Sequence, residues 1–205
     1  HKDPSTQLKP LLAAPMPHHA TPRIGKVYLV GAGPGDPGLI TVRGVECLAQ
    51  ADLVLFDYLV NPRLLQHLSA RAESVCLGRH GEGRMLSQSE VNGRMVEAAR
   101  AGQAVVRLKS GDPMIFGRAA EELTALADAG IEFEIVPGVT AAVAVGAYTG
   151  VSITRRDMAS AVAFVTAKEN LGQRESKLDY AALARFPGTL VFYMGVTTAK
   201  DWVGD

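Results

Sequence analysis

A glycine-rich segment that follows an apolar run is the part of this sequence best suited to hold a small ligand. Residues 27–41 read VYLVGAGPGDPGLIT, in which a β-prone run leads into closely spaced glycines. The apolar positions then take up helical spacing, so the segment predicts a strand, a glycine loop and a helix. Glycine lets the backbone adopt positive φ and approach a ligand closely, but it identifies no ligand, and a tight structural turn is the alternative.

The loop formally matches a dinucleotide-binding fingerprint, because Gly33, Gly35 and Gly38 have its spacing. Asp57 ends the next apolar run, about where a ribose-binding acid would fall. The two prolines of the loop, Pro34 and Pro37, argue against this interpretation, because each removes a backbone N–H that a pyrophosphate would need. The stiffened loop suits an uncharged ligand face better, and a Rossmann-like NAD-binding module is kept as a rival hypothesis.

Two further loops follow expected strands and carry polar residues. Residues 107–118 read RLKSGDPMIFGR, and Asp112 in this loop could accept hydrogen bonds from a ribose or a cationic ligand, or cap the next helix. Residues 137–142 read PGVTAA, which places Thr140 at a helix N-cap beside alanines that allow close approach. Ligand contact and ordinary capping both fit these positions.

Arginines stand at the ends of several expected elements and in a polar glycine loop, rather than along one helix face. A guanidinium pairs bidentately with a carboxylate, so this placement would suit a ligand with several carboxylates. Scattered surface arginines are the simpler explanation for each one taken singly. The positions concerned are Arg63, Arg79, Arg84, Arg118, Arg155 and Arg156.

The composition narrows the class of protein. The 205 residues are 47% hydrophobic, enough for one large or two modest cores, and 21 acidic residues balance 21 basic ones. This balance predicts neither a nucleic-acid partner nor a basic membrane patch, and no apolar stretch reaches the ~18 residues of a membrane span. Cys47 and Cys76 have no CxxC partner and the histidines lack metal-ligand spacing, so we expect free thiols, a reducing cytoplasmic compartment and no metal site.

The elements that must position these residues alternate between strands and helices from Lys26 onward. This order predicts an α/β fold whose mainly parallel sheet is covered on both faces. Ser87 and Glu90 have the spacing of a capping box, and Gly102 and Gly130 would end helices. The expected strands are 27–31, 53–57, 74–77, 104–108, 132–136, 161–166 and 189–194. The expected helices are 41–50, 62–69, 88–101, 117–129, 140–149, 179–185 and one from about 197.

The chain is expected to fall into three parts. Residues 1–25 are proline-rich and lack periodicity, which predicts a mobile arm. Residues 26–137 would form an N-terminal α/β domain, with Pro137-Gly138 as a hinge to a C-terminal domain at 138–205. Because two strands are too few for an α/β domain of the usual ~4–6 strands, we expect either that this second domain is truncated or that its strands borrow the first sheet.

Six segments of the chain, in their order and spacing, resemble the tetrapyrrole methylases over about residues 26–200. The likeness implies two α/β domains with S-adenosylmethionine in the cleft between them, and a homodimer. Within the family, the chain is most similar to members that methylate uroporphyrinogen III at C2 and C7, giving precorrin-2 for cobalamin and sirohaem synthesis. A methylase of the same fold that acts on a later corrin intermediate or a non-tetrapyrrole substrate is the alternative. The segments are GAGPGDPGLIT, LVLFDYLV, RLKSGDPMIFGR, VPGVTAA, GVSITRRD and LVFYMG.

The resemblance also assigns roles to residues. Asp57 stands at the family's proton-acceptor position, and Arg79 stands at the proton-donor position, where close relatives have lysine. Because the pKa of arginine lies above ~12, a contact with a substrate carboxylate suits Arg79 better than proton donation. The other residues expected to bind substrate are Arg63, Arg84, Arg118 and Arg155. The residues expected to line the cofactor are Pro34, Ser110, Gly111, Asp112, Ile115, Thr140, Ala141 and Met194.

Overall fold

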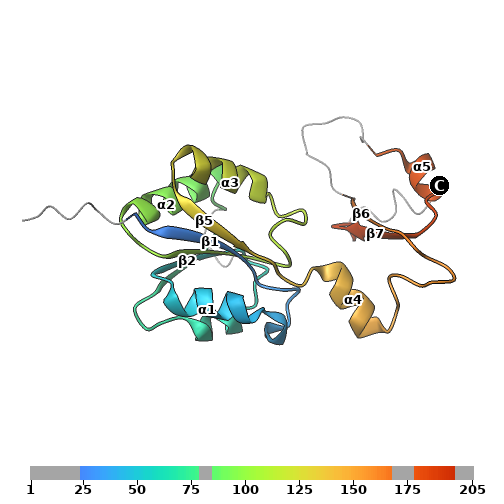
Figure 1. The fold of residues 1–205 in the computed structure, drawn as a ribbon, viewed down its shortest axis with the longest axis horizontal. Helices are drawn as coiled ribbons and strands as arrows, with labels where there is room; N and C mark the ends of the chain where they lie inside the picture. Colours follow the sequence, from blue (N-terminus) through green and yellow to red (C-terminus); the bar gives the residue numbers. More distant parts are fainter. Residues whose placement is uncertain (1–23, 79–84, 168–177, 197–205) are drawn as a thin grey trace, which may run out of the picture.

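The structure is a computed structural model that describes residues 24–78, 85–167 and 178–196 (Figure 1). The expected arm at the start of the chain and the expected helix from about 197 lie outside the described residues, as do Arg79 and Arg84. None of the helices in the described ranges is long and apolar enough to cross a membrane.

Five parallel strands form the main sheet in the order β3-β2-β4-β1-β5. The expected strands are confirmed to within a residue at each end, and so is the mainly parallel sheet. Because parallel strands share a direction, their carboxyl ends lie at one edge of the sheet, where the following loops converge. The strands are β1 (Lys26–Gly31), β2 (Leu53–Phe56), β3 (Glu73–Cys76), β4 (Val105–Lys109) and β5 (Glu132–Val136).

Helices cover both faces of the sheet (Figure 1). On one face, α1 (Val42–Gln50) and the 3-10 helix η2 (Pro62–His67) bury a core of the strands' Val and Leu side chains, which includes Leu48. On the other face, α2 (Gln88–Arg100) and α3 (Ala119–Asp128) bury a second core that includes Met95. The inner strands β1, β2 and β4 are accordingly rich in apolar residues, as expected for strands buried on both sides.

The helix ends follow local capping chemistry, with two departures from expectation. Ser87 and Glu90 form the expected capping box, and Gly102 and Gly130 end their helices at positive φ. The expected helix 62–69 is instead a 3-10 helix that ends at His67. The expected helix 117–129 begins at Ala119, because Arg118 adopts a left-handed conformation that interrupts the helical backbone.

The C-terminal strands form a sheet of their own. Strands β6 (Val162–Thr166) and β7 (Thr189–Tyr193) pair in parallel with each other and not with the main sheet. The alternative that they borrow the first sheet is therefore wrong. Helix α4 (Ala141–Thr149) leads from the main sheet toward this pair, and α5 (Tyr180–Ala184) precedes β7 (Figure 1).

Three glycines pack backbone against backbone where the loops converge. A Cβ on Gly31 would lie 2.5 Å from Gly138 Cα and 2.8 Å from Gly111 O. The loops after β1 and β4 are also bridged, because Gly33 N donates to Gly111 O at 3.2 Å and Gly111 N donates to Gly33 O at 2.7 Å. Some of the glycines that the sequence offers for ligand binding are thus required for contact between loops.

We expect Gly31→Ala to lower the free energy of unfolding by about 1–3 kcal/mol, because the new methyl group meets backbone that cannot move aside easily. Gly93→Ala is the matched control, since a Cβ at this position inside α2 meets nothing within 4 Å. It should raise stability by roughly 0.5–1 kcal/mol through helix propensity. Urea unfolding of both variants tests the pair, and equal effects would contradict the packing role of Gly31.

Candidate functional site

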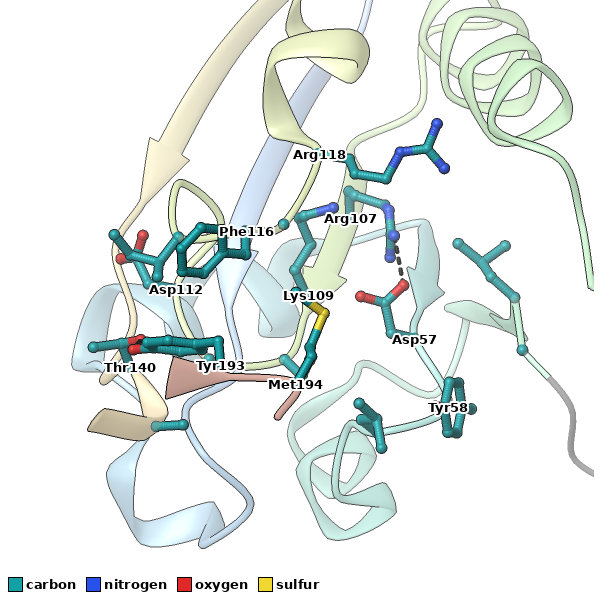
Figure 2. Close-up of a pocket in the computed structure, with 18 of the residues that line it drawn as sticks. Asp57, Tyr58, Arg107, Lys109, Asp112, Phe116, Arg118, Thr140, Tyr193 and Met194 are labelled. Carbon is teal, nitrogen blue, oxygen red and sulfur yellow. Dashed lines mark hydrogen bonds and ion pairs between the residues drawn. The ribbon is translucent and has the colours of Figure 1, made fainter. Parts of the chain in front are cut away.

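A cavity of about 540 Å³ lies at the carboxyl edge of the main sheet (Figure 2). Residues from the loops after all five strands line it, together with Tyr193 and Met194 at the end of β7. The position agrees with the general rule that open α/β sheets bind ligands outside the carboxyl ends of their strands. All the residues expected to line the cofactor contribute to its wall: Pro34, Ser110, Gly111, Asp112, Ile115, Thr140, Ala141 and Met194.

Asp112 holds two loops together at this wall. Its Oδ1 accepts a hydrogen bond from Met114 N at 2.8 Å, and its Oδ2 accepts one from Gly138 N at 3.0 Å. The carboxylate therefore stabilises a turn in its own loop and bridges this loop to the loop after β5. It does not cap α3. Its expected contact with a ligand remains a prediction.

Tyr193 supplies the cap that Thr140 was expected to give. Thr140 occupies the N-cap position of α4, as expected, but its side chain makes no capping hydrogen bond. Its Oγ1 instead lies 2.6 Å from the hydroxyl of Tyr193, which accepts a hydrogen bond from Ala142 N at 3.3 Å. Sequence reasoning did not single out Tyr193, although a hydroxyl beside Met194 at the end of a strand was a visible signal.

Backbone strain is concentrated around the cavity. Among the described residues, the non-glycine residues with positive φ are Phe116 (51°), Arg118 (55°) and Met194 (58°), and all three line the cavity. The ring of Phe116 packs against Tyr193 with ring centroids 5.0 Å apart. Such conformations cost of order 1–3 kcal/mol each and cluster at binding and catalytic sites. Their position therefore supports this cavity as the functional site.

A buried cluster of charges closes the other end of the cavity. Arg107 Nη2 donates to Asp57 Oδ1 at 2.5 Å, and Arg107 Nε donates to Glu122 Oε1 at 2.8 Å. Lys109 Nζ lies 2.9 Å from Glu122 Oε2, an ion-pair contact without hydrogen-bond alignment. Glu122 is fully buried, whereas the side chain of Asp57 is 30% exposed. Figure 2 shows Asp57, Lys109 and Met194 facing the same part of the cavity.

The cluster shifts the proton affinity of its cations. Burial and the nearby guanidinium of Arg107 lower the pKa of Lys109. Burial opposes the charge of Arg107, but the carboxylates of Asp57 and Glu122 outweigh it and raise the pKa of Arg107. Sequence reasoning did not assign Arg107, Lys109 or Glu122. The available signal was two cations at alternate positions of an apolar strand, which must point to one face of the sheet.

The structure brings one of the arginines expected to bind substrate to the cavity. Arg118 lines it, with a side chain that is 62% exposed and pairs with Glu121 at 2.6 Å. Arg63 lies in η2 and Arg155 pairs with Asp157 at 2.8 Å, and neither lines the cavity. Their role in substrate binding remains a prediction, as does that of the two arginines outside the described residues.

The glycine loop does not present a free helix N-terminus to an anion. Asp36 caps the 3-10 helix η1 (Pro37–Leu39), and its Oδ1 accepts a hydrogen bond from Gly38 N at 2.8 Å. Its Oδ2 accepts a hydrogen bond from the hydroxyl of Tyr148 at 2.7 Å, and these two bonds lower the pKa of Asp36. A carboxylate thus lies at the first helical turn after the glycine loop, where its charge would oppose a bound pyrophosphate. The acid expected to hold a ribose, Asp57, is already paired with Arg107.

Comparison with known proteins agrees with the expected family. The family model of the tetrapyrrole (corrin/porphyrin) methylases matches residues 26–203. A siroheme synthase of Zymomonas mobilis is 48% identical over 87% of this chain, and a uroporphyrinogen-III C-methyltransferase of Bacillus subtilis is 46% identical over 84% of it. The chain spans 37% and 36% of the lengths of these two relatives.

Comparison with solved structures points to the same family. A crystal structure of a uroporphyrin-III C-methyltransferase of Thermus thermophilus, complexed with S-adenosylhomocysteine, is 40% identical and superposes with a TM-score of 0.70. The match covers 87% of this chain and 74% of that one. Together with the six segments and the cavity at the carboxyl edge of the sheet, these matches show that the chain belongs to the tetrapyrrole (corrin/porphyrin) methylases.

Proposed function

We propose that this protein transfers methyl groups from S-adenosylmethionine to uroporphyrinogen III, at C2 and then C7, to give precorrin-2. One observation carries the proposal. The cavity joins a wall of loop residues that carry no cation to an end where a carboxylate, Asp57, is held by buried charged groups. The first end fits a cofactor without phosphate, and the second fits a reaction that releases a proton.

The wall without cations fits S-adenosylmethionine better than a dinucleotide. None of the residues expected to line the cofactor is cationic, and the helix start nearest to the glycine loop is capped by Asp36. A pyrophosphate would find no cation among these residues to balance its charge. S-adenosylmethionine has no phosphate, and it would supply an electrophilic methyl group on a sulfonium. The relative from Thermus thermophilus supports the assignment through its bound S-adenosylhomocysteine.

The residues at the charged end would handle the proton. A pyrrole carbon that gains a methyl group leaves the ring positively charged until a proton departs. The carboxylate of Asp57 is partly exposed to the cavity, so it can accept that proton directly or through one water. The rest of the catalytic effect would come from holding the reacting atoms in line.

The remaining wall suits a large ring with acidic edges. Tyr58, Leu59 and Met85 give this end an apolar surface, and Arg118 stands at its rim. A flat macrocycle can lie on the apolar surface while its carboxylates pair with guanidinium groups. Arg79, placed by resemblance at the donor position, would serve as another such contact.

Two other functions are less well supported. A methylase that acts on a later corrin intermediate would use the same fold, but the similarity of 46–48% is to siroheme synthase and uroporphyrinogen-III methyltransferase. An NAD-binding module is disfavoured by the carboxylate cap at Asp36 and by the pairing of Asp57.

We also propose that the protein forms a homodimer and is located in the cytoplasm. Helix α4 exposes two large apolar side chains one turn apart, Val145 and Tyr148, which are 60% and 65% exposed. Such a patch fits contact with a second copy in a homodimer. Cys47 and Cys76 are free thiols, which supports the reducing environment of the cytoplasm.

The reaction can be tested by incubating the protein with uroporphyrinogen III and S-adenosylmethionine and measuring the mass of the product. We expect a gain of two methyl groups. A protein that binds S-adenosylhomocysteine in calorimetry but leaves uroporphyrinogen III unchanged would point to the later corrin substrate. Tight binding of NAD without any response to S-adenosylhomocysteine would contradict the proposed function altogether.

We expect Asp57→Asn to lower kcat for methyl transfer by about 100-fold, because general-base assistance is worth at least that much in typical enzymes. Binding of S-adenosylhomocysteine should be unchanged, since the change lies at the other end of the cavity. Asp128→Asn, an exposed carboxylate at the end of α3, is the matched control and should keep full activity. Unimpaired methyl transfer by Asp57→Asn would remove its assignment as proton acceptor.

We expect Tyr193→Phe to weaken S-adenosylhomocysteine binding about fivefold, because a typical hydrogen bond contributes about 1 kcal/mol. The lost hydroxyl pairs with Thr140 and Ala142, which both belong to the start of α4 at the cofactor wall. Tyr180→Phe on the partly exposed α5 is the control, and calorimetry compares the two variants. Equal affinities would show that this hydroxyl does not support the cofactor wall.

A further inference from the structure

We propose that Glu122 is a positioning residue for proton acceptance, and that it acts with Lys109 by fixing the guanidinium of Arg107 against Asp57. This inference rests on the proposed role of Asp57 as proton acceptor. Glu122 does not line the cavity, so any effect it has on the reaction must pass through the residues that it contacts.

The contacts of Glu122 place it at the centre of the cluster. Its Oε1 accepts hydrogen bonds from Arg107 Nε at 2.8 Å and from Gln88 Nε2 at 3.3 Å. Its Oε2 lies 2.9 Å from Lys109 Nζ. One edge of the Arg107 guanidinium is thereby fixed to α3, while Nη2 points to Asp57 (Figure 2). Nη1 is held as well, because it donates to Leu108 O at 3.2 Å.

The cluster is electrically balanced. Two cations, Arg107 and Lys109, face two carboxylates, Asp57 and Glu122, through three contacts. In a buried site, a single uncompensated charge acts strongly on its neighbours because little water screens it. A change in this balance would therefore act directly on the carboxylate of Asp57, which contacts the cluster through Arg107. The ionisable groups around Asp57 are Arg107 and Lys109 on β4, Glu122 on α3, Cys76 on β3, Tyr58 beside it, and Arg118 before α3, which pairs with Glu121.

Removal of the charge of Glu122 and removal of the charge of Lys109 should shift the proton affinity of Asp57 in opposite directions. Glu122→Gln leaves an excess positive charge, which favours the ionised carboxylate of Asp57 and makes it a weaker base. Lys109→Met leaves an excess negative charge, which favours protonation of Asp57. The double variant Glu122→Gln/Lys109→Met restores the balance, because glutamine can still accept a hydrogen bond from Arg107.

The test measures kcat for methyl transfer against pH in the wild-type protein and the three variants. The acid limb of the profile marks the pH at which the base becomes protonated. We expect it to move to lower pH by about one unit in Glu122→Gln, to higher pH by about as much in Lys109→Met, and to return in the double variant. The KM for S-adenosylmethionine should stay unchanged in Glu122→Gln. Glu97→Gln on the exposed face of α2 controls for overall charge and should not move the limb.

A second measurement does not depend on turnover. In protein labelled with ¹³C at the aspartate carboxyl carbons, the titration of Asp57 can be assigned from its loss in Asp57→Asn. It should follow the same pattern of opposite shifts and recovery. Shifts in the same direction, or none in either single variant, would overturn the proposal, as would a double variant that resembles one of the single variants. The double variant is also the safest to fold, because it leaves no unpaired charge in the cluster.

The two measurements separate this proposal from the proposed function. If the carboxyl titrations shift as expected but uroporphyrinogen III gains no methyl group, the positioning role holds and the substrate assignment fails. If methyl transfer occurs but the titrations of the variants match the wild type, the substrate assignment holds and Glu122 serves stability alone.

Discussion

The cavity depends on the close backbone packing of Gly31, Gly111 and Gly138. A parallel sheet brings the loops after its strands to one edge, but it does not set how near they approach. Here a Cβ on Gly31 would meet Gly138 Cα at 2.5 Å, so the loops after β1, β4 and β5 can touch only because these positions lack side chains. The carboxylate of Asp112, bonded to Gly138 N, then locks two of the three loops together. This wall of the cavity is therefore built largely from backbone.

The opposite end of the cavity is built from charged side chains, and burial strengthens the electrostatic interactions among them. Glu122 and the cations of β4 are almost fully removed from water, which would be costly for any one of them alone. Their pairing compensates the cost and leaves the partly exposed Asp57 as the member that reaches the cavity. The lowered pKa of Lys109 and the raised pKa of Arg107 are both set by burial and by the charges of the neighbouring groups. Such coupled groups at a cavity wall are typical of sites that handle protons.

Much of the fold could be predicted from the sequence, because the inner strands are rich in apolar residues and glycine or proline stands in the loops that follow the strands. Local chemistry also predicted the capping box at Ser87 and the helix ends at Gly102 and Gly130. The start of α3 could not be predicted, since the left-handed conformation of Arg118 depends on the loop before it. The buried cluster was missed for a similar reason, because Glu122 meets Arg107 only when α3 packs on the sheet. Tyr193 was missed because its partners Thr140 and Ala142 lie more than fifty residues earlier.

The glycine fingerprint alone did not identify a ligand, because the spacing of Gly33, Gly35 and Gly38 leaves the chemistry of the loop open. This spacing fits a dinucleotide loop, yet the turn that the glycines lead into decides which ligand can bind. A free helix N-terminus would attract a phosphate, whereas the capped turn at Asp36 places a carboxylate there. Tyr148 of α4 completes the arrangement by bonding the other oxygen of Asp36. The loop therefore disfavours anions and contributes Pro34 to a wall without cations, so the same glycine pattern serves a different class of ligand.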